Sequence, residues 1–476
     1  MFTWIAGLAL ASAHAQTASN NAVFNGAGTA VTFSSAVIDA SAFASTSTTI
    51  CETIYSILNG TSGYGTYPAT GAIIDARGLT TSNSNFTCKN TIAESPWQSG
   101  TSYLDKPSVI LLPAGTITIS YTWLLPNNTR IIGQGASTPV GSGTTQTGTV
   151  LAAAANFSGP GSSISPVLAM VQFGEPSGAD TCKGSPSGIC FNISIEDVTL
   201  SNAIINGSTI TAANANIDGI LNLDSQELTY ARRVNLYGIT ETGLQIGYTN
   251  YAFQAQNSGP YEGISYNVPT GITGVYCAQI YGAGTRGIHG IKCNGNSGTA
   301  GILVDTASDS IEDVYVNGFT DGILVGSQSS TVSRAWGNLL SNISGGTAVT
   351  NLVHLCGSSA SGNCPASPTA LPRGITILGA TSGTTGSSTY TILDGVTGAM
   401  LSTSTDASVG IYALGEPVST GNSRFTTSPS VPAWFFGTTQ SPSSTCSNGS
   451  IYTSTSGSAS GGTLWGCIAS GWVMEK

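Results

Sequence analysis

Short apolar or alternating runs, each ended by turn residues, recur along this chain. Residues 109–112 are apolar and stop at Pro113, and residues 116–120 alternate isoleucine with threonine. A further run, 129–132, follows the turn signal Pro126-Asn-Asn. Because side chains two apart share a strand face, these runs predict three strands separated by turns. Three strands in about thirty residues are the size of one coil of a parallel β-helix.

The pattern repeats further along the chain. SIEDVTL at 194–200 returns as SIEDVYV at 310–316, and DGIL at 218–221 returns at 321–324. A single coil cannot bury its inner face alone, so coils must stack. The spacing predicts about ten coils of roughly 20–30 residues, which form a β-helix over residues 106–415.

Residues 47–60 have the features of an amphipathic helix. Thr49 and Glu52 have the spacing of a capping box, and Gly60 supplies a C-terminal stop. The apolar stripe consists of Ile50, Ile54, Ile57 and Leu58. A helix placed before the first coil is expected to cover the open end of the stack and shield its strand edges.

The order of these elements resembles a known superfamily. Helix, GAIIDARG (71–78), VILLPAGTITIS (109–120) and LLPNNTRIIGQG (124–135) follow one another. This order resembles the start of the pectate-lyase-like superfamily, nearest to its rhamnogalacturonase/epimerase-like branch, and the resemblance covers about residues 49–415. It implies an all-β, right-handed, single-stranded parallel β-helix. The superfamily includes lyases, glycoside hydrolases, epimerases and inert fibres, so fold alone does not set function.

The regions outside the coils differ in composition. Residues 1–15 have a short apolar core and end in Ala13-His-Ala, as a cleaved signal peptide does. Residues 16–105 form an N-terminal segment that contains the helix, and no later stretch has the run of about 18 apolar residues that a membrane span needs. A linker rich in Ser, Thr and Pro is expected at 416–445, and a small disulfide-closed β module at 446–476. These features predict a secreted protein without a transmembrane segment.

Composition narrows the class of partner. The chain has 61 glycines and only 8% charged residues, which suits short strands and tight turns. A net charge of −10 disfavours nucleic acid. The expected partner is a polysaccharide, and the oligomeric state stays open.

The ten cysteines fall into five couples that are close in sequence, which favours an oxidising compartment. The couples are Cys51/Cys88, Cys182/Cys190, Cys277/Cys293, Cys356/Cys364 and Cys446/Cys467. Sequence alone does not fix their connectivity, but local pairing is natural where sequence neighbours are also spatial neighbours. A zinc site is disfavoured, because no C-x-x-C occurs and only two histidines follow the signal segment.

The first group of candidate catalytic residues is Asp224, Glu227, Arg233 and Glu241, which do not recur between repeats. Paired carboxylates in adjacent coils would act as acid and base on a glycosidic bond. Alternatively they would hold Ca²⁺ in a lyase, with Arg233 as the base of β-elimination. No cofactor follows with certainty. The recurring Glu-Asp pairs at 196–197 and 312–313 are interpreted as turn residues.

The second group lies in Arg286-Gly-Ile-His-Gly-Ile-Lys292. Strand alternation predicts Arg286, Ile288 and Lys292 on one face and His289 with Ile291 on the other. Arg286 and Lys292 would bind a uronate carboxylate, and imidazole can transfer a proton near neutral pH. An ordinary solvated face is the alternative.

Two functions remain open at this stage. Fold resemblance and predicted export favour a secreted carbohydrate-active enzyme, a polysaccharide lyase or glycoside hydrolase that binds its substrate along a groove of the helix. The absence of N-T-D, D-D and W-x-D-H elements favours a non-catalytic surface, adhesive or tailspike-like β-helix.

Overall fold

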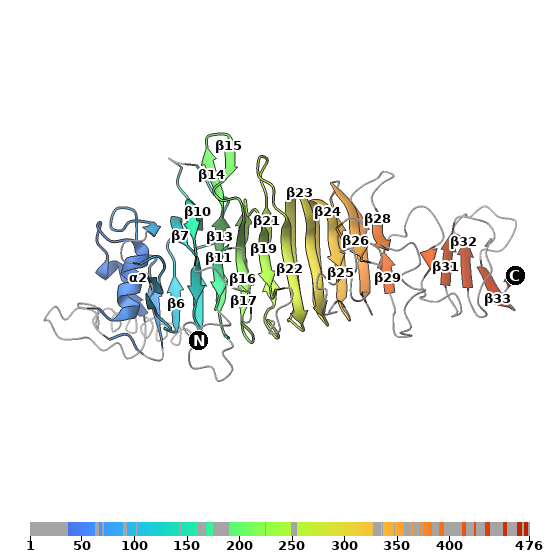
Figure 1. The fold of residues 1–476 in the computed structure, drawn as a ribbon, viewed down its shortest axis with the longest axis horizontal. Coiled ribbons are helices and arrows are strands. Elements are labelled where there is room, and N and C mark those ends of the chain that lie inside the picture. Colours follow the sequence, from blue (N-terminus) through green and yellow to red (C-terminus); the bar gives the residue numbers. More distant parts are fainter. Residues whose placement is uncertain are drawn as a thin grey trace, which may run out of the picture. The chain divides into compact units, whose positions relative to one another are not determined.

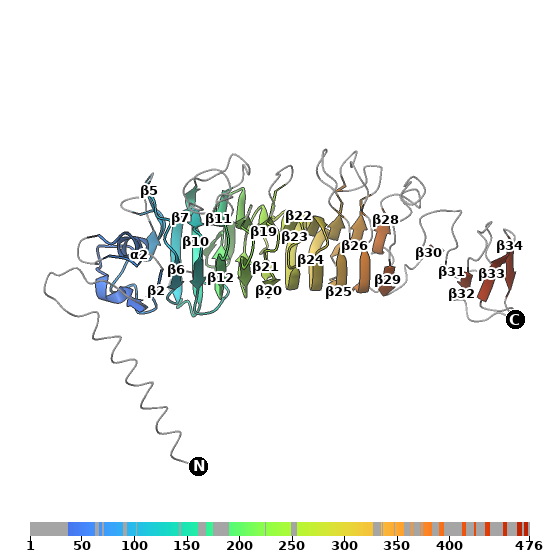
Figure 2. The ribbon, with the colours of Figure 1, turned by 90° about the horizontal axis from the view of Figure 1, so that it is seen from below.

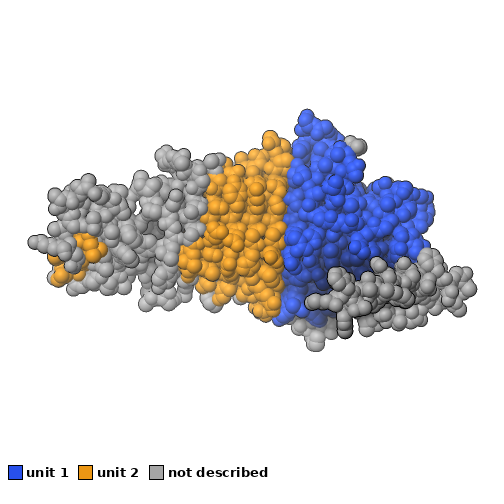
Figure 3. Space-filling model, turned by 180° about the vertical axis from the view of Figure 1, so that it is seen from behind, with its two compact units in different colours: residues 1–220, 224–237 blue, residues 221–223, 238–476 orange. Residues whose placement is uncertain are grey.

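The computed structural model describes most of the chain between residues 37 and 382 and short strands beyond it. The described residues are 37–61, 66–68, 71–88, 93–100, 102–141, 144–159, 168–174, 190–223, 225–248, 255–326, 335, 337–346, 348–356, 363–364, 372, 375–382, 390–394, 412–415, 423–424, 434–437, 451–454, 464–468 and 471–474. The predicted signal peptide and Asp224 therefore lie outside the described residues. The chain divides into two compact units: unit 1 comprises residues 1–220 and 224–237, and unit 2 residues 221–223 and 238–476 (Figure 3).

Helix α2 (Ile50–Asn59) confirms the helix that the sequence predicts, including its ends. The Thr49 side chain accepts a hydrogen bond from the Glu52 amide, and the Glu52 side chain accepts one from the Thr49 amide. Gly60 ends the helix in the left-handed region at φ 62°. All four residues of the predicted apolar stripe are buried. A short 3-10 helix, η1 (Ala40–Phe43), precedes α2.

Unit 1 consists of parallel strands stacked in ladders (Figure 1). The first ladder is β1 (Val37–Asp39), β2 (Ala72–Asp75), β6 (Ser108–Leu111), β9 (Thr129–Ile132), β12 (Ser194–Glu196) and β17 (Tyr230–Arg232). The second is β3 (Thr87–Cys88), β7 (Gly115–Tyr121), β10 (Thr149–Ser158), β13 (Val198–Ser201) and β18 (Asn235–Tyr237). A third pairs β8 (Trp123–Leu125) with β11 (Leu168–Phe173), and β11 pairs in turn with β16 (Ile217–Asn222). The three strands predicted from residues 109–132 are β6, β7 and β9, and β8 is an additional strand.

Unit 2 continues the same kind of parallel pairing with longer strands (Figure 2). Its strands are β19 (Thr242–Ile246), β20 (Tyr261–Glu262), β21 (Ser265–Asn267), β22 (Tyr276–Ala283), β23 (Ile288–Ala307), β24 (Ser310–Val325), β25 (Leu339–Gly345), β26 (Val349–Leu355), β27 (Thr376–Ser382), β28 (Tyr390–Asp394) and β29 (Tyr412–Gly415). Strand β23 pairs with β20, β21 and β22 on one side and with β24 on the other. In each unit, strands of successive coils pair in parallel with one another, which confirms the β-helix fold.

The remaining strands form small pieces of sheet. They are β4 (Gln98–Ser99), β5 (Ser102–Tyr103), β14 (Ala203–Asn206), β15 (Thr209–Ala212), β30 (Ser423–Arg424), β31 (Trp434–Gly437), β32 (Ile451–Ser454), β33 (Leu464–Ile468) and β34 (Gly471–Met474). Strands β30–β34 form a separate five-stranded sheet at the C-terminal end of the chain. Strand β31 lies in the segment expected to be a linker and pairs with β32. The exact domain boundaries stay predictions.

Inward-facing residues stack between coils to make the core. In unit 1, Ile110, Ile131 and Ile195 lie in register and are fully buried. In unit 2, Ile288 and Ile311 likewise lie in register and are fully buried. Burying one such side chain contributes about 1.5–3 kcal/mol, so each added coil stabilises its neighbours.

Two corners of unit 1 place a residue in the left-handed region. These residues are Asp197 at φ 56° and Arg233 at φ 50°, each directly after the paired residues Glu196 and Arg232. Glycine, Asn and Asp adopt this conformation most readily, whereas arginine does so at a cost. Arg233 therefore occupies the same structural position as Asp197, although the two residues differ in type.

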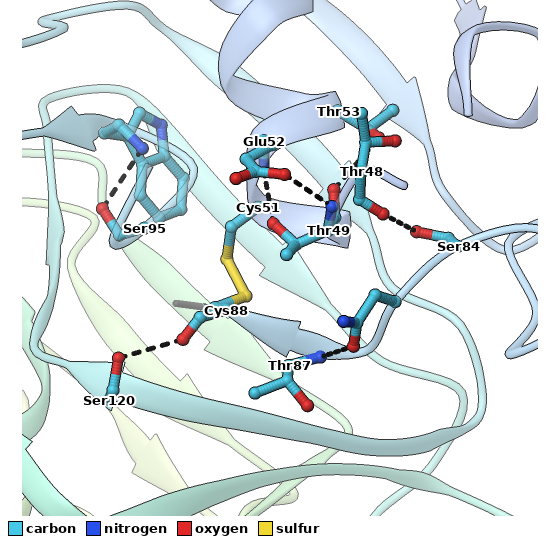
Figure 4. The surroundings of a disulfide bond; sticks show 12 residues. Thr48, Thr49, Cys51, Glu52, Thr53, Ser84, Thr87, Cys88, Ser95 and Ser120 are labelled. Atoms are coloured by element: carbon cyan, nitrogen blue, oxygen red, sulfur yellow. Dashed lines mark hydrogen bonds between the residues drawn. A yellow bond between two sulfur atoms is a disulfide. The ribbon is translucent and has the colours of Figure 1, made fainter. Parts of the chain in front are cut away.

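Three of the predicted disulfides are confirmed: Cys51–Cys88, Cys277–Cys293 and Cys356–Cys364. Cys190 and Cys467 are also disulfide-bonded, while Cys182 and Cys446 lie outside the described residues. The first bridge ties helix α2 to strand β3, beside the Thr49–Glu52 capping box (Figure 4). Among the described residues, no helix is both long and apolar enough to cross a membrane.

Candidate functional site

The structure divides the first predicted group of site residues between the two units and places the second group in unit 2. Glu227 and Arg233 belong to unit 1, where Glu227 lies exposed in the turn before β17. Glu241 belongs to unit 2 and is half-buried, and burial raises its pKa. The Tyr276 amide donates to the Glu241 carbonyl oxygen at 2.9 Å, and burial, followed by the charges of Glu241 and Asp321, raises the pKa of Tyr276.

Arg233 is part of an ion-pair network on the outside of unit 1, the Glu196 cluster. Its Nε and Nη2 each donate to one carboxylate oxygen of Asp197, both at 2.6 Å, and its Nη2 lies 3.6 Å from Glu196 Oε2. Glu196 Oε1 accepts from Arg130 Nη2 at 2.5 Å and from the Tyr230 hydroxyl at 2.8 Å. The register explains this arrangement, because β12 pairs with both β9 and β17.

The charges of the Glu196 cluster stabilise one another. Burial is the largest effect on Glu196 and raises its pKa, but the hydrogen bonds from Arg130 and Tyr230 and the nearby arginine charges outweigh it and lower the pKa overall. Burial and the bond to Glu196 raise the pKa of Tyr230. Glu196 therefore stays ionised and Tyr230 stays protonated. This arrangement suits structural support better than proton abstraction.

Glu196 should make stability depend on pH. A carboxyl group whose pKa is lowered by folding stabilises the protein above its unfolded pKa, near 4.5, and that contribution is lost as pH falls through the folded value. We expect the melting temperature of the wild type to exceed that of Glu196→Gln at neutral pH, with the gap closing in acid. A gap of the same size at every pH, measured by thermal circular dichroism, would contradict this assignment.

The second group gathers on the outside of unit 2 around one corner, the His289 cluster. His289 Nδ1 lies 3.7 Å from Glu312 Oε2, and its Nε2 lies 3.2 Å from the Arg286 carbonyl oxygen. Ser310 Oγ bonds the other Glu312 oxygen. Both His289 and Glu312 are about one-third exposed, at 33% and 35%. Lys292 Nζ lies 5.6 Å from the centre of the Tyr315 ring.

The predicted alternation along this segment is wrong. Ile288 and Ile291 are both buried, whereas Arg286 and Lys292 are exposed and His289 is partly exposed. The reason is the corner at Gly290, whose φ of 67° bends the chain and resets the inside–outside alternation. The three polar side chains consequently share the outer surface.

Gly287 is needed for this close stacking. Its φ is 86°, and a Cβ built on it would lie 2.3 Å from the Ser310 carbonyl oxygen and 3.2 Å from His289 Nε2. Any side chain would displace the imidazole or the next coil. The glycine therefore leaves room for the His289 ring to pack against residues 286–287.

Sequence reasoning missed Glu312, because the recurrence of Ser-Ile-Glu-Asp marked it as a turn residue. The structure pairs His289 with Glu312 in register, so the histidine occupies the position of the repeat glutamate in the preceding coil. The signal available in the sequence was the match between Gly-Ile-His-Gly at 287–290 and Ser-Ile-Glu-Asp at 310–313. Aligning these repeats places the two side chains next to each other.

The Ca²⁺ site considered in the sequence analysis needs several oxygen ligands close together. Within the part of the chain that the structure describes, no three His, Cys, Asp or Glu side chains lie close enough together to hold a metal ion. The residues present therefore supply no described ligand set for the Ca²⁺ considered above.

Comparison with known proteins finds only distant structural similarity. No protein-family model and no curated protein matches this chain. One similar solved structure is ORF18 of Geobacillus virus E2, with 11% identity and a TM-score of 0.23 over 66% of this chain and 57% of that one. Another is the A-module of the mannuronan C-5 epimerase AlgE4 from Azotobacter vinelandii, with 14% identity and a TM-score of 0.20 over 60% and 82%. The chain thus spans little more than half of the viral protein.

Proposed function

We propose that this protein binds an acidic polysaccharide on the outer face of unit 2 and cleaves it by β-elimination at the His289 cluster. The observation that carries the proposal is the pairing of His289 with Glu312, with the exposed cations Arg286 and Lys292 on the same turn of chain. A basic pair in a chain of net charge −10 is a local exception, and a uronate carboxylate is the ligand that such a pair recognises.

The hydrogen bonds of His289 indicate which nitrogen acts as the base. A carbonyl oxygen only accepts, so Nε2–H donates to the Arg286 carbonyl, and the neutral imidazole keeps its lone pair on Nδ1. Nδ1 is also the nitrogen that faces Glu312, at 3.7 Å. The carboxylate stabilises the imidazolium that forms when Nδ1 takes a proton.

These groups account for each proton and electron pair that moves in β-elimination. Arg286 and Lys292 neutralise the uronate carboxylate, which makes the neighbouring C–H more acidic. Nδ1 of His289 takes that proton, its electron pair becomes the carbon–carbon double bond, and the glycosidic C–O bond breaks. The leaving oxygen takes a proton from water or from the imidazolium. The products are a chain with an unsaturated uronate end and a chain with a new reducing end.

A polysaccharide panel tests the proposal. We expect polygalacturonate or alginate, but no neutral glucan, to yield both the ultraviolet absorbance of unsaturated uronate and new reducing ends. Arg286→Ala/Lys292→Ala should raise KM about tenfold or more, because two charge-assisted contacts with the substrate are lost. Reducing ends without the absorbance would mean hydrolysis instead.

Binding without either product would overturn the catalytic part of the proposal. The non-catalytic, adhesive interpretation would then hold. Affinity electrophoresis in gels containing each polysaccharide measures binding independently of turnover, so the two outcomes are distinguishable.

A further inference from the structure

A buried polar assembly in unit 2 lies apart from the residues used above. Asp321 on β24 and His354 on β26 are both inaccessible to solvent. The disulfide Cys356–Cys364, which contacts His354, belongs to an apolar cluster with Tyr281, Ala300, Leu303 and Leu324. A buried histidine and a buried carboxylate beside such a cluster need defined partners.

The partners form a chain that ends at a sulfur atom. Asp321 Oδ1 accepts from His354 Nδ1 at 2.9 Å and from Asn351 Nδ2 at 2.7 Å, and Asp321 Oδ2 accepts from Asn363 Nδ2 at 2.7 Å. The other ring nitrogen, His354 Nε2, lies 3.3 Å from Cys364 Sγ. The order Asp321, His354, Cys364 is that of a Cys–His–Asp catalytic triad.

This arrangement is better satisfied when the disulfide is reduced. A carboxylate only accepts, so His354 donates Nδ1–H to Asp321, and Nε2 is the ring nitrogen that faces Cys364. A disulfide sulfur carries no hydrogen and is only a weak acceptor. A reduced Cys364 makes a stronger hydrogen bond with Nε2, either as a thiol that donates to the ring nitrogen or as a thiolate that accepts from an imidazolium held by Asp321.

We propose that Cys356–Cys364 is a redox-active disulfide that exchanges with a dithiol, and that its reduced form is a Cys364–His354–Asp321 triad. In the reaction, the dithiol loses two electrons and forms its own S–S bond while the Cys356–Cys364 bond breaks. One of its two protons goes to Cys356, and the other goes to Cys364 and is shared with His354 Nε2. Stabilisation of the reduced form makes this disulfide a stronger oxidant than Cys277–Cys293, which has no such histidine in the structure's described contacts.

The Cys277–Cys293 disulfide is a control within the same molecule. Both of its cysteines are buried in unit 2, and it closes 16 residues, whereas Cys356–Cys364 closes 8. The shorter loop costs less entropy to close, so loop length alone should make Cys356–Cys364 the harder of the two to reduce. The proposed triad predicts the opposite order.

The test is an equilibrium titration of the full chain in mixtures of reduced and oxidised dithiothreitol. Thiols are trapped by alkylation, and each bridge is quantified by peptide mapping. We expect Cys356–Cys364 to be half-reduced at a reduced-to-oxidised ratio at least about tenfold lower than Cys277–Cys293. His354→Gln should remove most of that difference and leave the Cys277–Cys293 midpoint unchanged.

Two results would overturn the proposal. One is a Cys356–Cys364 midpoint equal to or more reducing than that of Cys277–Cys293 in the wild type. The other is an unchanged Cys356–Cys364 midpoint in His354→Gln. If that variant is not recovered folded, the wild-type comparison decides alone, because the two bridges report on the same sample.

Discussion

His289→Ala is expected to lower kcat/KM on the acidic polysaccharide that the wild type cleaves by about a hundredfold or more, the usual contribution of general acid–base catalysis. The variant removes the only described nitrogen base in the His289 cluster and leaves Arg286 and Lys292 in place. KM should therefore change less than kcat. The initial rate of unsaturated uronate formation measures both constants.

Ser341→Ala is the matched control. Ser341 pairs with Glu312 in the next coil, on the same outward column, and carries no group that can act as a base at neutral pH. It should retain wild-type turnover. If His289→Ala is as active as Ser341→Ala, the base lies elsewhere and the proposed mechanism is wrong.

The Glu312→Gln variant distinguishes a role of Glu312 in supporting His289 from a purely structural role. Glutamine keeps the size of the side chain but removes the charge that faces Nδ1 of His289. The imidazolium that forms during proton abstraction loses a nearby carboxylate, so we expect kcat to fall while KM changes little. A purely structural role would lower the melting temperature without this difference between kcat and KM.

Removing the Cys51–Cys88 disulfide is expected to have the largest effect on stability. The bridge closes 37 residues, and for a loop of this length the chain-entropy account gives about 4 kcal/mol. It also holds α2, whose Ile54 and Leu58 are fully buried, over the first strands of the stack. Once the helix detaches, unpaired strand edges become available to other chains.

Cys51→Ala/Cys88→Ala should therefore unfold at lower urea concentration and scatter light more strongly as protein concentration rises. Ser102→Ala, at an exposed position of β5, is the control and should match the wild type. An unchanged urea midpoint with no added light scattering in the double cysteine variant would show that α2 stays in place without the bridge.

Local signals in the sequence were sufficient for the elements themselves. The capping box at Thr49 and Glu52 and the stop at Gly60 define α2, because each acts within one helical turn. Alternation and turn residues likewise defined β6, β7 and β9. Disulfides between sequence neighbours followed from the stacked fold, because successive coils keep such residues close.

The candidate sites depended on the register between coils, which no local pattern contains. His289 meets Glu312, and Asp197 meets Arg233, only because strands of successive coils pair residue by residue. The left-handed corner at Gly290 placed Ile288 and Ile291 on the same inner side, against simple alternation. The link from Asp321 through His354 to Cys364 joins two coils and a disulfide loop. The sequence by itself therefore determined which strands, turns and helix form, since these depend on neighbours along the chain. Which polar side chains meet was decided only by the tertiary structure, since those contacts run between coils.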